Sequence, residues 1–194
     1  MFASSPNDDR RFVSLSKAQF QIRDSDLLLF RRRGLISIAG RGVHSHAAKA
    51  VWWHDTLMCC EVREWVGGRA KPLASQVAKY PGRIDVFQVN PDNSPAYSRM
   101  GASLFMLDLT GKDYGYAHVL WAALLHMPVL RIFCRPQLRD TDLNGKPPFC
   151  SEAVAMADRI GGGVDPVPNL ADRLTEPADL ARSTFYQYRM TLLP

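Results

Sequence analysis

The sequence predicts an α+β fold in which a small antiparallel sheet packs against helices. Short apolar or alternating runs that end at Gly, Pro, Asp or Asn indicate strands, and longer amphipathic stretches indicate helices. The composition, 194 residues with 46% apolar and 22% charged, suits one domain with a sizeable core. We therefore expect an N-terminal tail or extension at residues 1–22 and a single domain at 23–194.

Five segments are expected to be strands. The run Leu-Leu-Leu-Phe at 27–30 is wholly apolar, which is typical of a strand buried on both faces. Residues 43–53 and 57–65 form the two arms of a hairpin around the turn His54-Asp55. The segments 84–89 and 185–190 alternate between apolar and polar residues, as strands do.

Helices are expected at 72–83 (or an irregular segment there), 95–109, 117–127 and 150–160. The second has Met100, Leu104 and Leu107 among its apolar positions. The last follows a stiff Lys-Pro-Pro segment and ends at the glycines 161–163. Residues 12–22 carry mixed signals, with a short strand or a helical turn as the alternatives.

The charge and the cysteines limit the classes of function. A net charge of +5 and a pI near 9.2 permit a polyanionic partner. The arginines near residues 31–41, however, have no interleaved aromatic residues and no nucleic-acid-binding motif, so no nucleic-acid partner is expected. Cys59 and Cys60 are adjacent and poorly placed to bridge one another, which favours a reducing compartment.

No segment indicates export or a membrane span. The first eleven residues are polar and charged, unlike a signal peptide. The longest apolar run, 119–130, is interrupted by His126 and Pro128 and is too short to cross a bilayer. We expect a soluble cytoplasmic protein without stable membrane insertion, while access to the cell envelope by another route stays open.

Cys150 is the candidate nucleophile. It opens the helix at 150–160, where unpaired backbone N–H groups and the helix dipole lower the pKa of a thiol. Cys150, Val154 and Ala157 recur at helical spacing, so a buried core cysteine is the alternative interpretation.

His46 and Glu61 are the candidate base and its orienting acid. With a two-residue loop at His54-Asp55, Ala48 lies opposite Glu61, and His46 is then the diagonal neighbour of that carboxylate. A loop one residue longer would place Glu64 opposite His46 instead, so geometry leaves Glu61 and Glu64 as alternatives. Strand alternation puts His44 on the same face as His46.

Together, Cys150, His46 and Glu61 compose a Cys–His–Glu triad. The imidazole would deprotonate the thiol, and the carboxylate would hold the ring and stabilise its cation. The backbone N–H of Cys150 would supply one oxyanion donor. This chemistry is acyl transfer through a thioester, followed by hydrolysis or by transfer to a second nucleophile.

The order of four motifs resembles a known family. DSDLLLF at 24–30, VHSHAAKAVWW at 43–53, CCEV at 59–62 and FCSEAV at 149–154 are similar to the circularly permuted papain-like cysteine hydrolases of the NlpC superfamily, closest to the YiiX/YebB-like branch. The resemblance covers roughly residues 24–180. It implies a permuted papain-like catalytic domain and places His46, Glu61 and Cys150 at the family's catalytic positions. Ser25 stands where the family has glycine.

The resemblance implies a peptidase or amidase, and neither a cofactor nor a resident metal is expected. Its first implied substrates are peptidoglycan-type stem peptides or related amides, and acyl lipids are second, with an acyltransferase as the alternative activity. Two further alternatives remain. One is a zinc site that draws on His44, His46, His54, Cys59 and Glu61. The other is a non-catalytic module that binds a ligand in the same cleft.

Overall fold

The computed structural model describes residues 10–32, 42–63, 66–90, 92, 95–112 and 148–194. A seven-stranded sheet with the order β1-β7-β6-β2-β3-β4-β5 forms its centre. Of the strand pairs in these residues, β1 with β7 is parallel and the others are antiparallel. The strands are β1 (Phe12–Ser14), β2 (Leu27–Arg31), β3 (His44–Trp53), β4 (Thr56–Arg63), β5 (Gly67–Pro72), β6 (Ile84–Val89) and β7 (Tyr186–Leu193).

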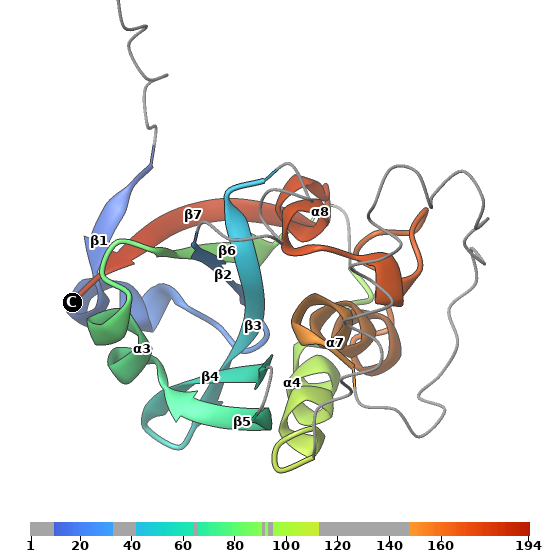
Figure 1. The fold of residues 1–194 in the computed structure, drawn as a ribbon, viewed down its shortest axis with the longest axis horizontal. Helices are drawn as coiled ribbons and strands as arrows, with labels where there is room; N and C mark the ends of the chain where they lie inside the picture. The colour runs from blue at the N-terminus through green and yellow to red at the C-terminus, as the bar shows by residue number, and fades with distance from the viewer. Residues whose placement is uncertain (1–9, 33–41, 64–65, 91, 93–94, 113–147) are drawn as a thin grey trace, which may run out of the picture.

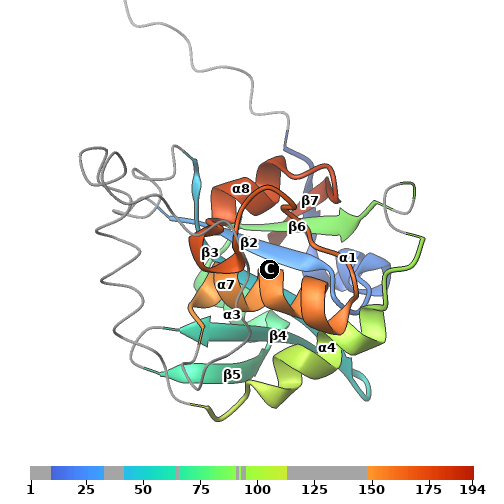
Figure 2. The same cartoon turned by 90° about the vertical axis from the view of Figure 1, so that its right-hand side faces the viewer.

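Helices cover both sides of this curved sheet. In Figure 1, α3 lies on one side and α4, α7 and α8 lie on the other. Figure 2 shows α7 in front of the sheet, where it packs against β3 and β4. The helices are α1 (Leu15–Ala18), α3 (Leu73–Lys79), α4 (Arg99–Asp108), α7 (Cys150–Met156) and α8 (Pro177–Arg182), with the 3-10 turns η1 (Gln19–Gln21) and η4 (Asp172–Leu174) and the π turn η3 (Ala157–Gly161). The predicted α+β class is confirmed.

Strand β2 is the centre of the core. Leu28 and Phe30 pack into an apolar cluster on the α3 side, whereas Leu27 and Leu29 pack into a second cluster that includes Val154 of α7. An uninterrupted apolar run is required because both faces of the strand are covered. The prediction that residues 27–30 form a strand buried on both faces is confirmed.

The predicted hairpin is also present. Strand β3 pairs with β4 through Trp53 and Thr56, and the two-residue turn between them places His54 at a φ of 51°. The ladder continues to Lys49 opposite Cys60, which is the register that a two-residue loop requires.

The expectation that His44 and His46 share one face is wrong. Phe30 pairs with His46 while the next residue of β2 pairs with His44, so β3 has one extra residue, Ser45, at this point. Such a bulge rotates the chain before it. The His46 ring contacts Phe30 in the first cluster, and the His44 ring contacts Phe87 in the second.

Helix α4 buries a different face from the expected one. It begins at Arg99 instead of residue 95, and Met100 and Leu104 are 73% and 59% exposed. The buried residues are Ala102, Ser103 and Met106, and the helix crosses η3 at close range. A Cβ on Gly101 would lie 2.1 Å from the carbonyl oxygen of Gly161.

Residues 10–22 belong to the same sheet and core as the rest of the chain. Strand β1 pairs with β7, and Ala18 and Ile22 are buried in the first cluster. The expected helices at 72–83 and 150–160 are present as α3 and as α7 continued by η3, whereas the expected helix at 117–127 lies outside the described residues. Within the described residues, every helix is too short or too polar to traverse a bilayer.

Candidate active site

Cys150 is the first residue of α7, and the start of this helix is fixed by its own first turn. The Glu152 carboxylate accepts a hydrogen bond of 3.2 Å from the backbone N–H of Phe149, the residue before the helix. Acidic residues in the first turn are favoured because the N–H groups there lack intrahelical partners. Burial raises the pKa of Glu152 to about 7, against the hydrogen bond from Phe149, which lowers it.

The Cys150 thiol is nearly buried, with 8% of the residue exposed. Burial alone would raise the pKa of the thiol. The charge and hydrogen bond of His46 and the backbone N–H groups of Ala47 and Ser151 outweigh burial, so the pKa is lowered overall. These donors come from β3 and from the helix start. Together they stabilise a thiolate, the reactive form of the side chain.

His46 lies between the thiol and Glu61. Its Nε2 atom is 2.5 Å from Oε2 of Glu61. Since Nε2 is used by the carboxylate, Nδ1 is the ring nitrogen available to Cys150, with which His46 also hydrogen-bonds. Burial would lower the pKa of His46, but the thiolate and the carboxylate outweigh this and raise it to about 9.

Glu61 is buried and is held from three directions. Arg69 on β5 is its cross-strand partner and donates to Oε1 through Nε at 2.8 Å and through a terminal nitrogen at 2.6 Å. Arg63 is more distant, with Nε 3.8 Å from Oε2. Burial raises the pKa of Glu61, but His46 and these arginines outweigh it and lower the pKa to about 2.

Arg69 is a site residue that the sequence analysis missed, because β5 was not predicted. A signal was available. The Gly67-Gly68 pair follows the end of β4, and an opposite charge eight residues after Glu61 matches the cross-strand pairing that the structure shows.

The structure separates His44 and Cys59 from this group. Glu64, the alternative to Glu61, lies outside the described residues. His44 hydrogen-bonds through Nε2 to Asp85 at 2.8 Å, and that carboxylate also pairs with Arg31. Cys59 is fully buried in the α3-side cluster, where burial raises the pKa of its thiol well above the ordinary value.

The donor atoms of the described residues do not fit a metal ion. In the part of the chain that the structure describes, no group of three or more His, Cys, Asp or Glu residues lies close enough to hold one. In the nearest arrangement, Cys150 with His46 and Glu61, the imidazole stands between the sulfur and the carboxylate. One metal ion would therefore reach at most part of this set.

Comparisons with known proteins identify the fold. No family model matches the sequence, and no curated protein matches it. Among solved structures, the chain is similar to the crystal structure of metalloprotein yiiX from Escherichia coli O157:H7, described as DUF1105. The TM-score is 0.61 and the sequence identity 13%, and the similarity covers 90% of this chain and 99% of that chain. The predicted resemblance to the YiiX-like branch is thus confirmed at the level of the fold.

Proposed function

We propose that the chain is a cysteine hydrolase that cleaves an amide, peptide or acyl bond through a thioester on Cys150. The observation that carries this proposal is the continuous hydrogen-bonded series from the Cys150 thiol through the His46 ring to Glu61. A nucleophile, a base and an orienting acid in this order are what acyl transfer requires.

The first step forms the acyl-enzyme. The Cys150 thiolate attacks the carbonyl carbon of the substrate, and the carbonyl oxygen takes up the negative charge of the tetrahedral intermediate. The backbone N–H of Cys150 supplies one donor for this oxyanion. As the bond to the leaving group breaks, His46 gives its proton to the departing amine or alkoxide.

The second step restores the enzyme. A water molecule attacks the thioester while neutral His46 accepts a proton from it, and the carboxylic acid product leaves as the C–S bond breaks. Glu61 stabilises the imidazolium in both steps and keeps its ring oriented. A second nucleophile in place of water would make the same site an acyltransferase.

The similar structure from E. coli is named a metalloprotein, which makes a metal site the second candidate. The described residues here do not fit that description, because the Cys150–His46–Glu61 group is already satisfied by its internal hydrogen bonds. The lowered pKa of Cys150 and the raised pKa of His46 instead support a thiolate–imidazolium pair.

The substrates we propose first are peptidoglycan-type peptides, with other amides and acyl lipids as alternatives.

The direct test is the pH dependence of iodoacetamide labelling at Cys150, followed by peptide mass spectrometry. Cys59 and Cys60 are internal controls, since burial raises the pKa of both and that of Cys60 to about 12. We expect Cys150 to label first and at a lower pH than a free thiol, and His46→Ala to raise its apparent pKa. His54→Ala, in the exposed β3–β4 turn, is the matched control and leaves labelling unchanged.

Turnover of an activated thioester or ester separates a hydrolase from a binding module. We expect wild type and His54→Ala to turn over such a substrate and Cys150→Ser to lose this activity. If Cys150 labels no faster than Cys59 and Cys60, the proposed hydrolase is wrong. Rapid labelling of Cys150 without turnover of any acyl substrate would indicate a ligand-binding site.

A further inference from the structure

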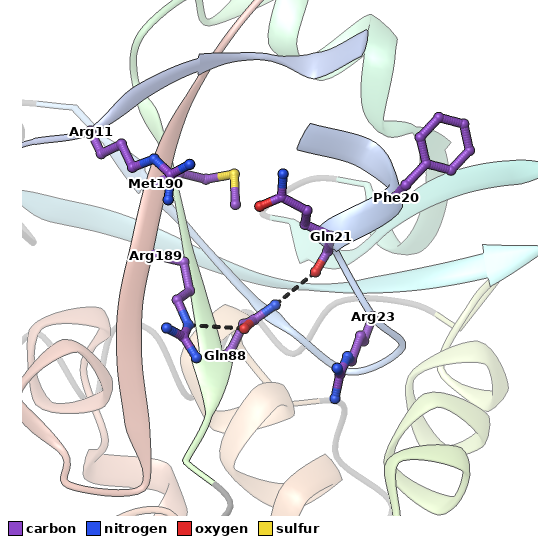
Figure 3. A pocket seen from close by; sticks show the side chains of 7 residues that line it. All are labelled: Arg11, Phe20, Gln21, Arg23, Gln88, Arg189 and Met190. Carbon is purple, nitrogen blue, oxygen red and sulfur yellow. Dashed lines mark hydrogen bonds between the residues drawn. The ribbon is translucent and has the colours of Figure 1, made fainter. Parts of the chain in front are cut away.

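A polar pocket lies away from the candidate active site. Its volume is about 350 Å³, and its lining comes from the segment before β1, from η1 and the loop after it, and from β6 and β7. Figure 3 shows the side chains of Arg11, Arg23 and Arg189 on three sides of it, with the amide groups of Gln21 and Gln88 between them.

The lining carries three positive charges and no carboxylate. Within the described residues, the structure gives neither Arg11 nor Arg23 a side-chain ion pair, and Nε of Arg189 donates to the neutral amide oxygen of Gln88 at 2.9 Å. Guanidinium groups that share a pocket repel one another unless an anion lies between them. Their arrangement therefore favours an anionic ligand.

Asp26, a buried acid that is bonded to Gln88 of the lining, already has other partners. The amide of Gln88 donates to Asp26 at 3.2 Å, but this carboxylate also accepts from the backbone N–H of Arg23 at 2.9 Å and from Arg99 at 2.7 Å. Burial raises the pKa of Asp26, against these hydrogen bonds. Asp26 thus holds the Gln88 amide by a hydrogen bond, while its negative charge is paired with Arg99.

The pocket is distinct from the Cys150 site in both residues and position. None of Cys150, His46 and Glu61 lines it. His46 pairs with Phe30 near the end of β2, whereas Arg23 precedes the start of that strand. Binding in the pocket can therefore be measured without reference to the thiol.

We propose that this pocket binds a small ligand that carries phosphate or carboxylate groups. Guanidinium groups recognise both kinds of oxyanion through paired N–H donors. Phe20 adds an apolar surface to the lining, since it is 81% exposed and unusually open for a large aromatic residue. A ligand with an organic part next to its anionic groups fits this combination.

The test is isothermal titration calorimetry of the full chain at low salt, with inorganic pyrophosphate as one probe and citrate as the other. We expect one site per chain for at least one probe, and the preferred probe identifies phosphate or carboxylate as the anionic group. Arg23→Gln with Arg189→Gln should weaken binding by about tenfold for each guanidinium removed. Lys71→Gln with Arg83→Gln removes the same charge from exposed positions outside the pocket and should leave binding nearly unchanged.

A single isosteric change gives an independent check. Gln21 is an exposed residue of the lining, so Gln21→Glu adds a carboxylate with little effect on packing. We expect it to weaken binding of the same probe. Absence of binding by both probes, or equal losses in the pocket pair and the control pair, would show that the arginines do not form a site.

Discussion

Nζ of Lys49 lies 2.6 Å from Oδ1 of Asp158, and both side chains are completely buried. Lys49 is on β3, three residues after His46, and Asp158 is in the π turn that continues α7 from Cys150. The pair therefore joins the strand of the proposed base to the helix of the proposed nucleophile. Tyr97 and Tyr186 also donate to Asp158, which leaves no buried charge in this group without a partner.

Removal of one member of this pair should destabilise the fold strongly. We expect Lys49→Met to lower the free energy of unfolding by about 3–5 kcal/mol, because it leaves the Asp158 carboxylate buried without its cation. The double variant Lys49→Met with Asp158→Leu should be less destabilised than the sum of the two single variants. Urea denaturation of the four proteins measures this coupling. Strict additivity would mean that the two side chains do not act as a pair.

The pKa of His46 predicts how stability changes with pH. Because the folded-state pKa is about 9 and the ordinary value is 6.5, this group stabilises the fold fully below pH 6.5, and the contribution is lost as the pH rises through about 9. The lowered pKa of Cys150 offsets this loss, because the folded imidazolium and the unfolded thiol each hold one proton over this range. The titration of the His46 ring itself is therefore the measurement, and by NMR we expect a pKa near 9 in wild type and a lower one in Cys150→Ser, which lacks the thiolate. A wild-type ring that titrates near 6.5 would contradict the raised pKa.

Arg69 should act on catalysis through Glu61. We expect Arg69→Gln to lower the turnover of an activated substrate, because the carboxylate that orients the ring loses both of its hydrogen bonds from Arg69. The pKa of His46 should rise, because the loss of the guanidinium charge leaves the Glu61 carboxylate to act more strongly on the imidazolium. Arg63→Gln is the matched control, since its Nε is 3.8 Å from the carboxylate, and its effect should be smaller. NMR titration of the His46 ring separates this positioning effect from a general loss of structure. Identical titration curves for both variants would exclude it.

Glu152 should make the helix start sensitive to pH near neutrality. Its pKa of about 7 exceeds the ordinary 4.5, so its contribution to stability is fully present below pH 4.5 and is lost as the pH rises through about 7. Glu152→Gln keeps an acceptor for the Phe149 N–H without the charge. We expect this variant to be more stable than wild type at pH 8, by about 1–3 kcal/mol, and to differ little from it at pH 4. A stability difference that does not vary with pH would contradict this prediction.

The local features of the fold could be predicted from the sequence. The two-residue turn at His54-Asp55 set the register of β3 and β4, and this register brought His46 within reach of Glu61. The run at 27–30 could be predicted because burial on both faces leaves no position for a polar residue.

The features that depend on distant contacts could not be predicted in this way. Ser25 adopts a φ of 61°, which glycine favours, and it is held there by a bond from its N–H to Ala50 and from its hydroxyl to Arg99. The bulge at Ser45 and the exposure of Met100 likewise follow from contacts between segments far apart in the chain.

The two members of the proposed triad on β3 and β4 belong to one hairpin, whereas the thiol comes from a helix about ninety residues later. His46 and Glu61 can thus meet as soon as the hairpin forms. The thiol joins them only when α7 docks on the finished sheet. During refolding, the reactivity of Cys150 would then rise after the hairpin has formed, and it would report the last long-range step of assembly.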